Sequence, residues 1–201
     1  SSYAGGGCRR PRQNGKTLPG RQREFRMRQF ESVGEDALTG RRLLMLEVET
    51  PEEVAAGVAK SPHGYPALVV WNARHVEPAM IGAVVESLLK SGCTFLGAWG
   101  DDCGRVHDIA DEVLVEREVY RGIPSDVMTT FHPNESLNDA LWFVLNLSAP
   151  MADDADNYKE TVVVSIGASP GTNAALRRAL VDTAEFNRTV VGEEVGGTPA
   201  R

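Results

Sequence analysis

The sequence predicts an α/β protein: a three-layer flavodoxin- or Rossmann-like sandwich with about five mainly parallel strands. Two observations support this fold class. Apolar runs without polar alternation, typical of strands covered on both faces, recur along the chain. Segments whose apolar residues return every three or four positions, typical of amphipathic helices, separate these runs. Strands that alternate with helices in this way form parallel sheets.

The strands are expected at four clear runs and two weaker ones. The clear runs are LLMLEVE, ALVVW, CTFLGAW and TVVVSIG, at residues 43–49, 67–71, 93–99 and 161–167. VLVERE, at 113–118, is interpreted as a further short strand, because the helical pattern before it ends near Ala110 and its first residues are β-branched or apolar. VMTT, at 127–130, is the last candidate.

Helices are expected between these runs. Pro51, after Thr50, and Pro78 each stand at a first helical position. A further helix begins near Cys103, and another follows Asn173. The helix at about 134–147 is capped by Asn134 or Ser136.

Three apolar side chains of the helix at 134–147 lie off its core stripe: Trp142, Phe143 and Leu147. This helix is therefore predicted to be buried on a second side or to carry an interface. A homodimer through Trp142 and Phe143 is one option.

Charge divides the chain into a basic start and an acidic body. Residues 1–42 hold ten Lys and Arg against four Asp and Glu, and the remainder holds eleven against twenty-four. We expect residues 1–40 to be a basic flexible arm, 41–189 a single α/β domain and 190–201 a frayed tail. Nucleic-acid binding is expected only if the arm serves it, because the body carries a balance of −13.

The apolar content predicts a chain without a membrane span, because no run reaches the roughly 18 uninterrupted apolar residues that a span needs. The three cysteines form no C-x-x-C pair, which favours a reducing, cytoplasmic setting. The amino terminus lacks the apolar stretch of a secretory signal.

The loop GAWGDDCG, residues 97–104, follows a predicted strand and is the first candidate site. Ligands of open α/β sheets bind outside the carboxyl ends of the strands, so Asp101, Asp102 and Cys103 are candidate catalytic residues. The adjacent carboxylates oppose direct contact with phosphate. They suit a hard metal ion, the hydroxyls of a ribose or sugar, or a helix cap. Cys103 is a possible nucleophile, with an inert packed cysteine as the alternative.

Two histidines complete the candidate catalytic set. His107 shares a helix face with Asp111, four residues on, which suits an acid/base histidine or an ordinary surface pair. His132 follows the candidate strand at 127–130, so its loop is expected at the same edge of the sheet as the GDDC loop. A cluster of these histidines with the aspartates, Cys103, Thr130 and Glu135 is a geometric possibility. No paired-ligand spacing indicates a metal site.

A third junction, SIGASPGTN at 165–173, supplies candidate cofactor-binding residues, which are Gly167, Ser169, Gly171 and Thr172. Its small residues and hydroxyls lead into a helix, and it resembles the phosphate loop of flavodoxin-like FMN reductases. In that family the loop follows the first strand, whereas here it lies in the last strand–helix unit. A phosphate, if one binds, is expected here rather than at the acidic loop.

GDDCGRVHDIADE together with TTFHPNESLNDALWF is similar to an uncharacterised family of small bacterial α/β proteins, across residues 65–167. This resemblance implies the fold and a bacterial setting, and it carries no activity. The sequence identifies no cofactor, which stays unknown. The sequence favours a small cytoplasmic module that binds a small-molecule ligand or a protein partner in an accessory or regulatory role. The alternative is a small, metal-assisted hydrolase or transferase that acts on nucleotides.

Overall fold

The strands form one sheet in the computed structural model, which describes residues 28–124, 126–148 and 158–196. The sheet order is β1-β2-β6-β3-β4-β5, with β2 parallel to β6, β6 to β3, β3 to β4 and β4 to β5. β1 is antiparallel to β2. The strand bounds are β1 Glu31–Glu35, β2 Arg42–Val48, β3 Tyr65–Trp71, β4 Cys93–Trp99, β5 Met128–Phe131 and β6 Glu160–Ile166.

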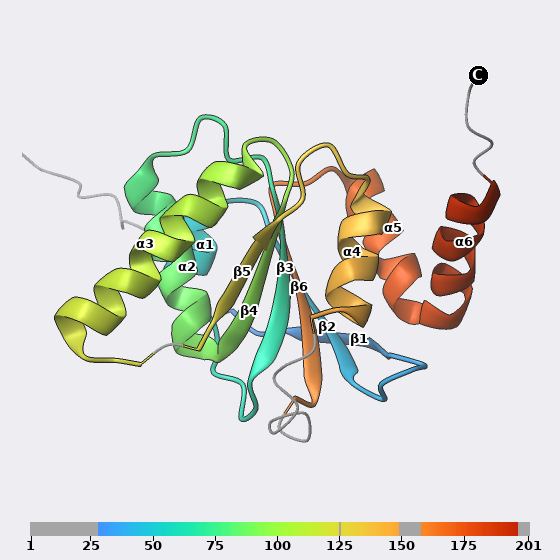
Figure 1. Cartoon of the computed structure of the whole chain (residues 1–201), viewed down its shortest axis with the longest axis horizontal. Coiled ribbons are helices and arrows are strands. Elements are labelled where there is room, and N and C mark those ends of the chain that lie inside the picture. Colours follow the sequence, from blue (N-terminus) through green and yellow to red (C-terminus); the bar gives the residue numbers. More distant parts are fainter. Residues whose placement is uncertain (1–27, 125, 149–157, 197–201) are drawn as a thin grey trace, which may run out of the picture.

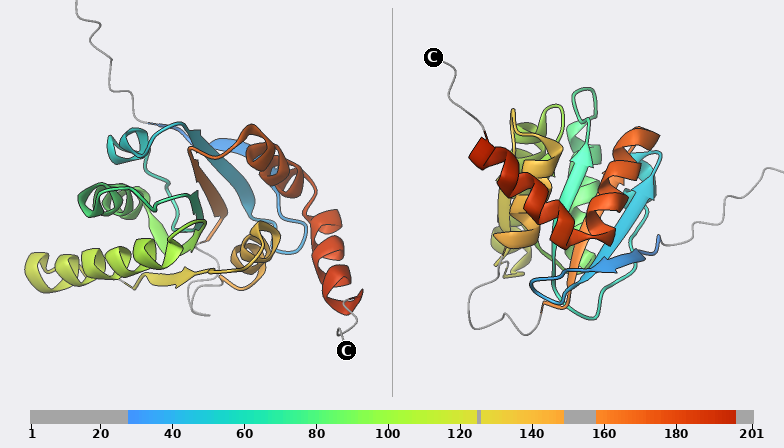
Figure 2. Two further views of the ribbon diagram at one scale, coloured as in Figure 1. Left: turned by 90° about the horizontal axis from the view of Figure 1, so that it is seen from above. Right: turned by 90° about the vertical axis from the view of Figure 1, so that its right-hand side faces the viewer.

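Helices cover both faces of the sheet, so the predicted three-layer α/β architecture is confirmed (Figures 1 and 2). One layer holds α1, α2 and α3, and the other holds α4, α5 and α6. The bounds are α1 Pro51–Ala55, α2 Pro78–Ser91, α3 Cys103–Arg121, α4 Leu137–Asn146, α5 Pro170–Val181 and α6 Thr183–Gly196.

Strand periodicity separates the buried residues into two cores. Every residue of β3 and β6 is buried, as expected for central strands with a helix layer on each side. We call the core under α1–α3 the first core and the core under α4–α6 the second core. Along β3, Val69 belongs to the first core, while Leu68 and Val70 belong to the second core. Successive side chains of a strand point to opposite faces, so one apolar run supplies both cores.

Local signals place the starts of α1 and α2 where the sequence predicts them, with Pro51 and Pro78 in the first turn. α5 begins at Pro170, earlier than the start predicted after Asn173, because Ser169 caps it and Pro170 opens its first turn. Ser136 caps α4, and its side chain and that of Asp139 form a capping box. α4 therefore begins at Leu137, three residues later than the start predicted at 134.

The short strand predicted at 113–118 is wrong, because this segment is the continuation of α3. Val113 and Leu114 pack against the same core as Val106 and Ala110, at helical spacing. Val115 is exposed instead, so the apolar run covers two sides of a helix. Its β-branched residues resemble a strand in sequence, but tertiary packing decides the outcome.

Regular structure extends beyond both predicted limits of the domain. β1 falls within the predicted arm, and it pairs with β2 through the turn at 36–41. The predicted tail also begins too early, since α6 continues to Gly196 and buries Phe186 and Val190 in the second core. Residues 1–27 of the arm and 197–201 of the tail lie outside the described residues.

The order in which the chain adds parallel strands to the sheet reverses once. The chain moves outward from β3 to β4 and β5, then returns to insert β6 between β2 and β3. This order differs from the common Rossmann and flavodoxin orders, although the layering is the same. The connections after β3 and β6 pass to opposite faces of the sheet, through α2 and α5. Such a switch point leaves a crevice at the carboxyl ends of the two strands.

None of the helices in the described part of the chain combines the length and the apolar character that a membrane crossing requires.

Candidate functional site

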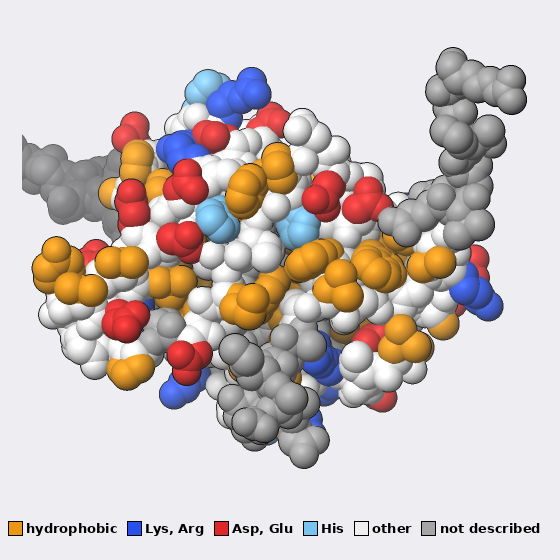
Figure 3. Space-filling view, in the orientation of Figure 1, with side chains coloured by type: hydrophobic (Ala, Val, Ile, Leu, Met, Phe, Trp, Pro, Cys, Tyr) orange, Lys and Arg blue, Asp and Glu red, His pale blue; other side chains and the backbone are white. Residues whose placement is uncertain are grey.

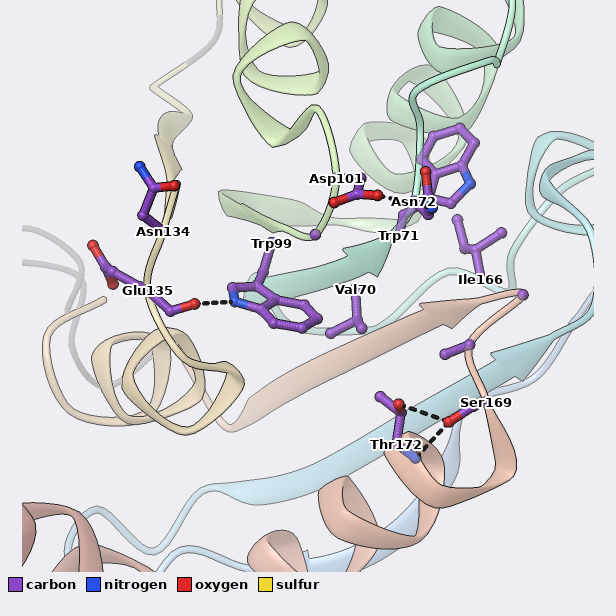
Figure 4. A pocket seen from close by; sticks show the side chains of 13 residues that line it. Val70, Trp71, Asn72, Trp99, Asp101, Asn134, Glu135, Ile166, Ser169 and Thr172 are labelled. Carbon is purple, nitrogen blue, oxygen red and sulfur yellow. Dashed lines mark hydrogen bonds between the residues drawn. The ribbon is translucent and has the colours of Figure 1, made fainter.

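A cleft of about 500 Å³ lies at this switch point (Figure 4). This volume is within the range of small-molecule sites. The ends of β3, β4 and β6 and the loop after β5 all contribute to its lining, which comprises Val70, Trp71, Asn72, Trp99, Gly100, Asp101, Asn134, Glu135, Ile166, Gly167, Ala168, Ser169 and Thr172. The position agrees with the rule that α/β sheets bind ligands outside the carboxyl ends of their strands.

The wall formed by the β3 and β4 loops presents an amide and a carboxylate. The Asn72 side chain donates to Asp101 (Nδ2 to Oδ2, 3.2 Å), and the Ala73 backbone N–H donates to the Asp101 carbonyl oxygen (3.0 Å). Gly100 permits this close approach, because a Cβ there would lie 2.3 Å from the Trp71 carbonyl oxygen. Its φ of +122° also suits glycine.

Arg105 joins the loop after β3 to the loop after β4. Its guanidinium donates to the carbonyl oxygens of Val76 (2.8 Å) and Ala73, and its Nε atom donates to Asp102 (2.7 Å). The loop after β3 is thus joined to the first turn of α3. This side chain is therefore structural, and it holds the Asn72 wall in place.

Trp99 lies between the two walls of the cleft (Figure 4). It is the last residue of β4, and its indole Nε1–H donates to the carbonyl oxygen of Glu135 (3.0 Å). This bond limits rotation of the ring and ties the end of β4 to the loop after β5. A fixed indole face is a stacking surface for a flat or apolar part of a ligand.

The opposite wall carries hydroxyl groups at the start of α5 (Figure 4). Ser169 is the N-cap residue, and its Oγ atom accepts from the Thr172 backbone N–H (3.1 Å). The two hydroxyls are also 2.9 Å apart. Gly167 has a φ of +62°, which turns the chain from β6 toward the helix.

A buried histidine, His132, contacts the cleft-lining residue Glu135 from outside the cleft. The His132 side chain is only 4% exposed, and its Nδ1 atom lies 2.9 Å from Glu135 Oε2. Its ring meets the edge of Phe143, with the centroids 4.9 Å apart. His132 therefore orients the Glu135 carboxylate and does not line the cleft itself.

The remaining candidate catalytic residues lie in three different environments. Asp102 is exposed and pairs with Arg105, so it makes no side-chain cap of α3. Cys103 is buried in the first core. His107 lies 3.3 Å from Asp108 and 3.7 Å from Asp111, and its ring packs on Phe131 outside the cleft lining.

The structure thus divides the predicted cluster, and Asp101 and Glu135 are its members that line the cleft. In the described residues, no three His, Cys, Asp or Glu side chains are arranged to hold a metal ion. Three of the four candidate cofactor-binding residues, Gly167, Ser169 and Thr172, do line the cleft. Gly171, in the first turn of α5, does not.

Sequence reasoning missed the aromatic and amide residues of the cleft, which are Trp71, Asn72, Trp99 and Asn134. A signal for them was present, because Trp71 and Trp99 are the last residues of two predicted strands. The rule that placed Asp101 at the ligand edge applies equally to them.

A family model described as a domain of unknown function (DUF7684) matches residues 43–183, so the chain belongs to this family. The match spans the sheet from β2 to β6 and every segment that lines the cleft. No curated protein matches the chain.

Proposed function

We propose that the protein is a small ligand-binding module, with an accessory or regulatory role, and that its ligand occupies the switch-point cleft. The observation that carries this proposal is the convergence of a fixed indole ring, Trp99, with the Asp101 carboxylate in a cleft of ligand size. The ligand we infer is a small molecule that bears hydroxyl groups and a flat or apolar ring, and that has no negative charge.

The charge of the cleft supports this choice of ligand. Asp101 lines it, and no Lys or Arg is among its described lining residues. Glu135 also belongs to the lining, but its carboxylate points away from Trp99 (Figure 4). A carboxylate in a partly enclosed space repels a phosphate or another carboxylate. It accepts hydrogen bonds from hydroxyls, and it attracts a cation. A nucleoside or a sugar fits this chemistry better than its phosphorylated form.

The two polar walls support recognition of hydroxyl groups from both sides. Asp101 can only accept hydrogen bonds when ionised, whereas Ser169 and Thr172 can donate as well as accept. A ligand between these walls can therefore use each hydroxyl as donor or acceptor. The small number of placed polar groups around an aromatic surface is typical of small-molecule sites.

An enzyme is the second candidate, because His132 orients the carboxylate of Glu135 beside the cleft, in the manner of a general base held by a second group. In this reading the protein is a hydrolase or transferase acting on a nucleoside-like substrate. The simpler binding role is favoured by the divergence of Asp102, Cys103 and His107 from the cleft. Product formation from a bound ligand, lost in Glu135→Gln, would establish the enzyme.

We also propose a bacterial and cytoplasmic setting. The resemblance to small bacterial α/β proteins supports the first part. Cys93 and Cys103 are free and buried, which suits a reducing compartment and supports the second.

The test is a binding screen with paired ligands: ribonucleosides and monosaccharides against their phosphates. Thermal shift identifies binders, and tryptophan fluorescence then reports the site. We expect the uncharged member of a pair to bind at least about 10-fold more tightly. Asp101→Asn should weaken binding by a similar factor, whereas Asp108→Asn, whose carboxylate is 78% exposed on α3, should not.

The three tryptophans allow the site to be assigned directly. Ligand-dependent quenching should persist in Trp142→Phe, since Trp142 lies on α4 outside the cleft lining. It should be reduced in Trp99→Phe and should largely disappear when Trp71→Phe is added, because both of these tryptophans line the cleft. If phosphorylated ligands bind more tightly, or if Asp101→Asn and Asp108→Asn behave alike, the ligand class proposed here is wrong. If no ligand shifts the melting temperature, the binding role itself is rejected.

A further inference from the structure

β5 is one edge of the sheet, and in the described residues it pairs only with β4. Its four residues, Met128 to Phe131, include no charged residue and no proline. Edge strands usually carry such residues, or a bulge, because their unpaired N–H and C=O groups otherwise attract another strand. The β5 edge carries none of these, and its short length of four residues is the protection that it retains.

Exposed apolar side chains flank this edge on both faces of the sheet. We define the β5-edge patch by five residues: Val115 and Val119 of α3, Met128 and Phe131 of β5, and Leu147 after α4, which are 57%, 66%, 56%, 44% and 54% exposed. Apolar side chains form a band across α3, β5 and α4 in the space-filling view (Figure 3). In the left view of Figure 2, β5 is the lower edge of the sheet, with α3 on one side of it and α4 on the other.

We propose that this edge pairs with the β5 edge of a second copy of the chain, across a two-fold axis. The two β5 strands would lie antiparallel and join the sheets of both protomers. The β5-edge patches would meet above and below the new strand pair. A two-fold contact of this kind is closed, because the same surface is used by both protomers.

The layered shape of the edge argues for a second copy as the occupant. A single added strand would pair with the free N–H and C=O groups of β5, but it would leave Val115 and Val119 of α3 exposed to solvent. A partner must present a strand edge with apolar helix surface on both sides of it. The protein's own β5 edge meets this requirement.

The apolar area also suits a dimer. At roughly 150 Å² for a large side chain, the exposed parts of the five residues amount to on the order of 400 Å² per protomer. Stable interfaces bury about 800 Å² per partner, so the patch supplies about half before the backbone and polar surroundings are added.

Antiparallel strands bring the two α3 helices together head to tail, so Val115 and Val119 of one protomer face the pair formed by His107 and Phe131 of the other. Both halves of α3 expose acidic side chains, and Arg121 pairs with Glu86 and Glu116 of its own chain. These like charges oppose the contact, so the dimer depends on the apolar patch and on the strand pairing.

This surface differs from the one the sequence suggested. Trp142 and Phe143 are partly buried against the second core, and Phe143 packs on Phe95 and His132. They therefore satisfy the expectation of a helix buried on a second side. Leu147 is the residue of that group that remains exposed. The cleft, between β3 and β6, stays open in the proposed dimer.

The experiment is sedimentation velocity on the full chain over a concentration series up to on the order of 100 µM. We expect a concentration-dependent dimer. Val119→Lys should raise the dissociation constant by roughly 100-fold or more, because it places a charge in the apolar contact. Val181→Lys is the matched control, since Val181 is 65% exposed near the end of α5 and far from β5 in the sheet order. It should leave the dimer unchanged.

Hydrogen exchange provides a second, independent readout. The β5 amides should exchange more slowly at dimer-forming concentrations than in dilute protein, and Val119→Lys should remove that difference. A wild-type chain that stays monomeric throughout the series overturns the proposal. So does a dimer that Val119→Lys leaves intact, or one whose β5 amides show no concentration-dependent protection.

Discussion

The two edges of the sheet are built in different ways. β1 is antiparallel to β2, its register shifts between Ser32 and Gly34, and the edge carries charged residues at Glu31 and Glu35. Arg177 of α5 bonds to Glu31 and to Glu47 of β2. β5 is parallel to its neighbour, regular in register and uncharged.

The difference indicates that only one of these edges is suited to pairing with another chain. The bulge and the charged side chains hinder the addition of a strand at β1. The β1 edge is therefore a closure of the domain, made by contacts within one chain. The β5 edge leaves equivalent groups unused, so substitutions at the two edges should affect different properties.

Gly34→Ala should cause the largest loss of stability. A Cβ at Gly34 would lie 2.3 Å from the Leu180 carbonyl oxygen, so β1 and the end of α5 would have to separate. We expect the free energy of unfolding to fall by about 2–3 kcal/mol, as for other overpacked sites. Urea denaturation followed by circular dichroism measures this change.

Gly192→Ala is the control for the same chemical change. Gly192 lies in α6, where an added Cβ meets nothing within 4 Å, and alanine favours helix by up to about 1 kcal/mol. Equal stability of the two variants would show that β1 does not pack closely on α5.

Asp36→Ala should have the second largest effect, because Asp36 holds the turn that leads from β1 to β2. Its side chain is buried and accepts hydrogen bonds from the Thr39 backbone N–H (3.1 Å) and from the Thr39 hydroxyl. Removal breaks both hydrogen bonds and should cost about 1–1.5 kcal/mol, since water can reach the donors of the exposed Thr39. Thermal denaturation measures the loss, and Asp108→Ala, on the exposed face of α3, should be nearly neutral. A neutral Asp36→Ala would exclude a role for this turn in closing the edge.

These two positions show which parts of the fold the sequence could predict. The central strands were predicted closely, because a strand buried on both faces leaves an uninterrupted apolar run, as in β3 and β6. β1 was missed because ESVGE has little apolar content and its stability depends on Arg177 and the backbone of Leu180, which are distant in sequence. The course of α3 was missed because its exposed valines imitate a strand.

The lining of the cleft could be predicted only in part. Asp101, Gly167, Ser169 and Thr172 follow strands, so the edge rule places them at the end of the sheet where the cleft lies. Whether Cys103 and His107 face the cleft depends on the rotation of α3, which is set by packing against the first core. Sequence spacing alone does not contain that information. The strand order that brings β6 beside β3 was likewise not readable from the chain.

Arg177→Met should have a small effect that depends on pH. The hydrogen bond and positive charge of Arg177 hold the pKa of Glu31 below its usual value. A lowered pKa in the folded state means that the pair stabilises the protein above the pKa of Glu31 in the unfolded chain. That contribution is lost as the pH falls through the folded pKa. Because the pair is largely exposed, we expect less than about 1 kcal/mol near neutral pH.

Urea titrations of the wild type and Arg177→Met at pH 7 and near pH 3 measure this dependence. The difference between the two proteins should shrink at the lower pH. A difference that is constant with pH would mean that Arg177 acts through the packing of its aliphatic stem rather than through its charge.

Met128→Lys should have the smallest effect on the stability of the monomer, although it changes the open edge directly. Met128 is 56% exposed and lies at the start of β5, so a lysine there can extend into solvent. In dilute protein, where the monomer prevails, we expect a change in unfolding free energy within about 0.5 kcal/mol. At dimer-forming concentrations the same variant should lower the melting temperature relative to the wild type, because association stabilises only the folded chain. A large loss at every concentration would mean that β5 is an internal part of the fold, and the contrast between the two edges would then fail.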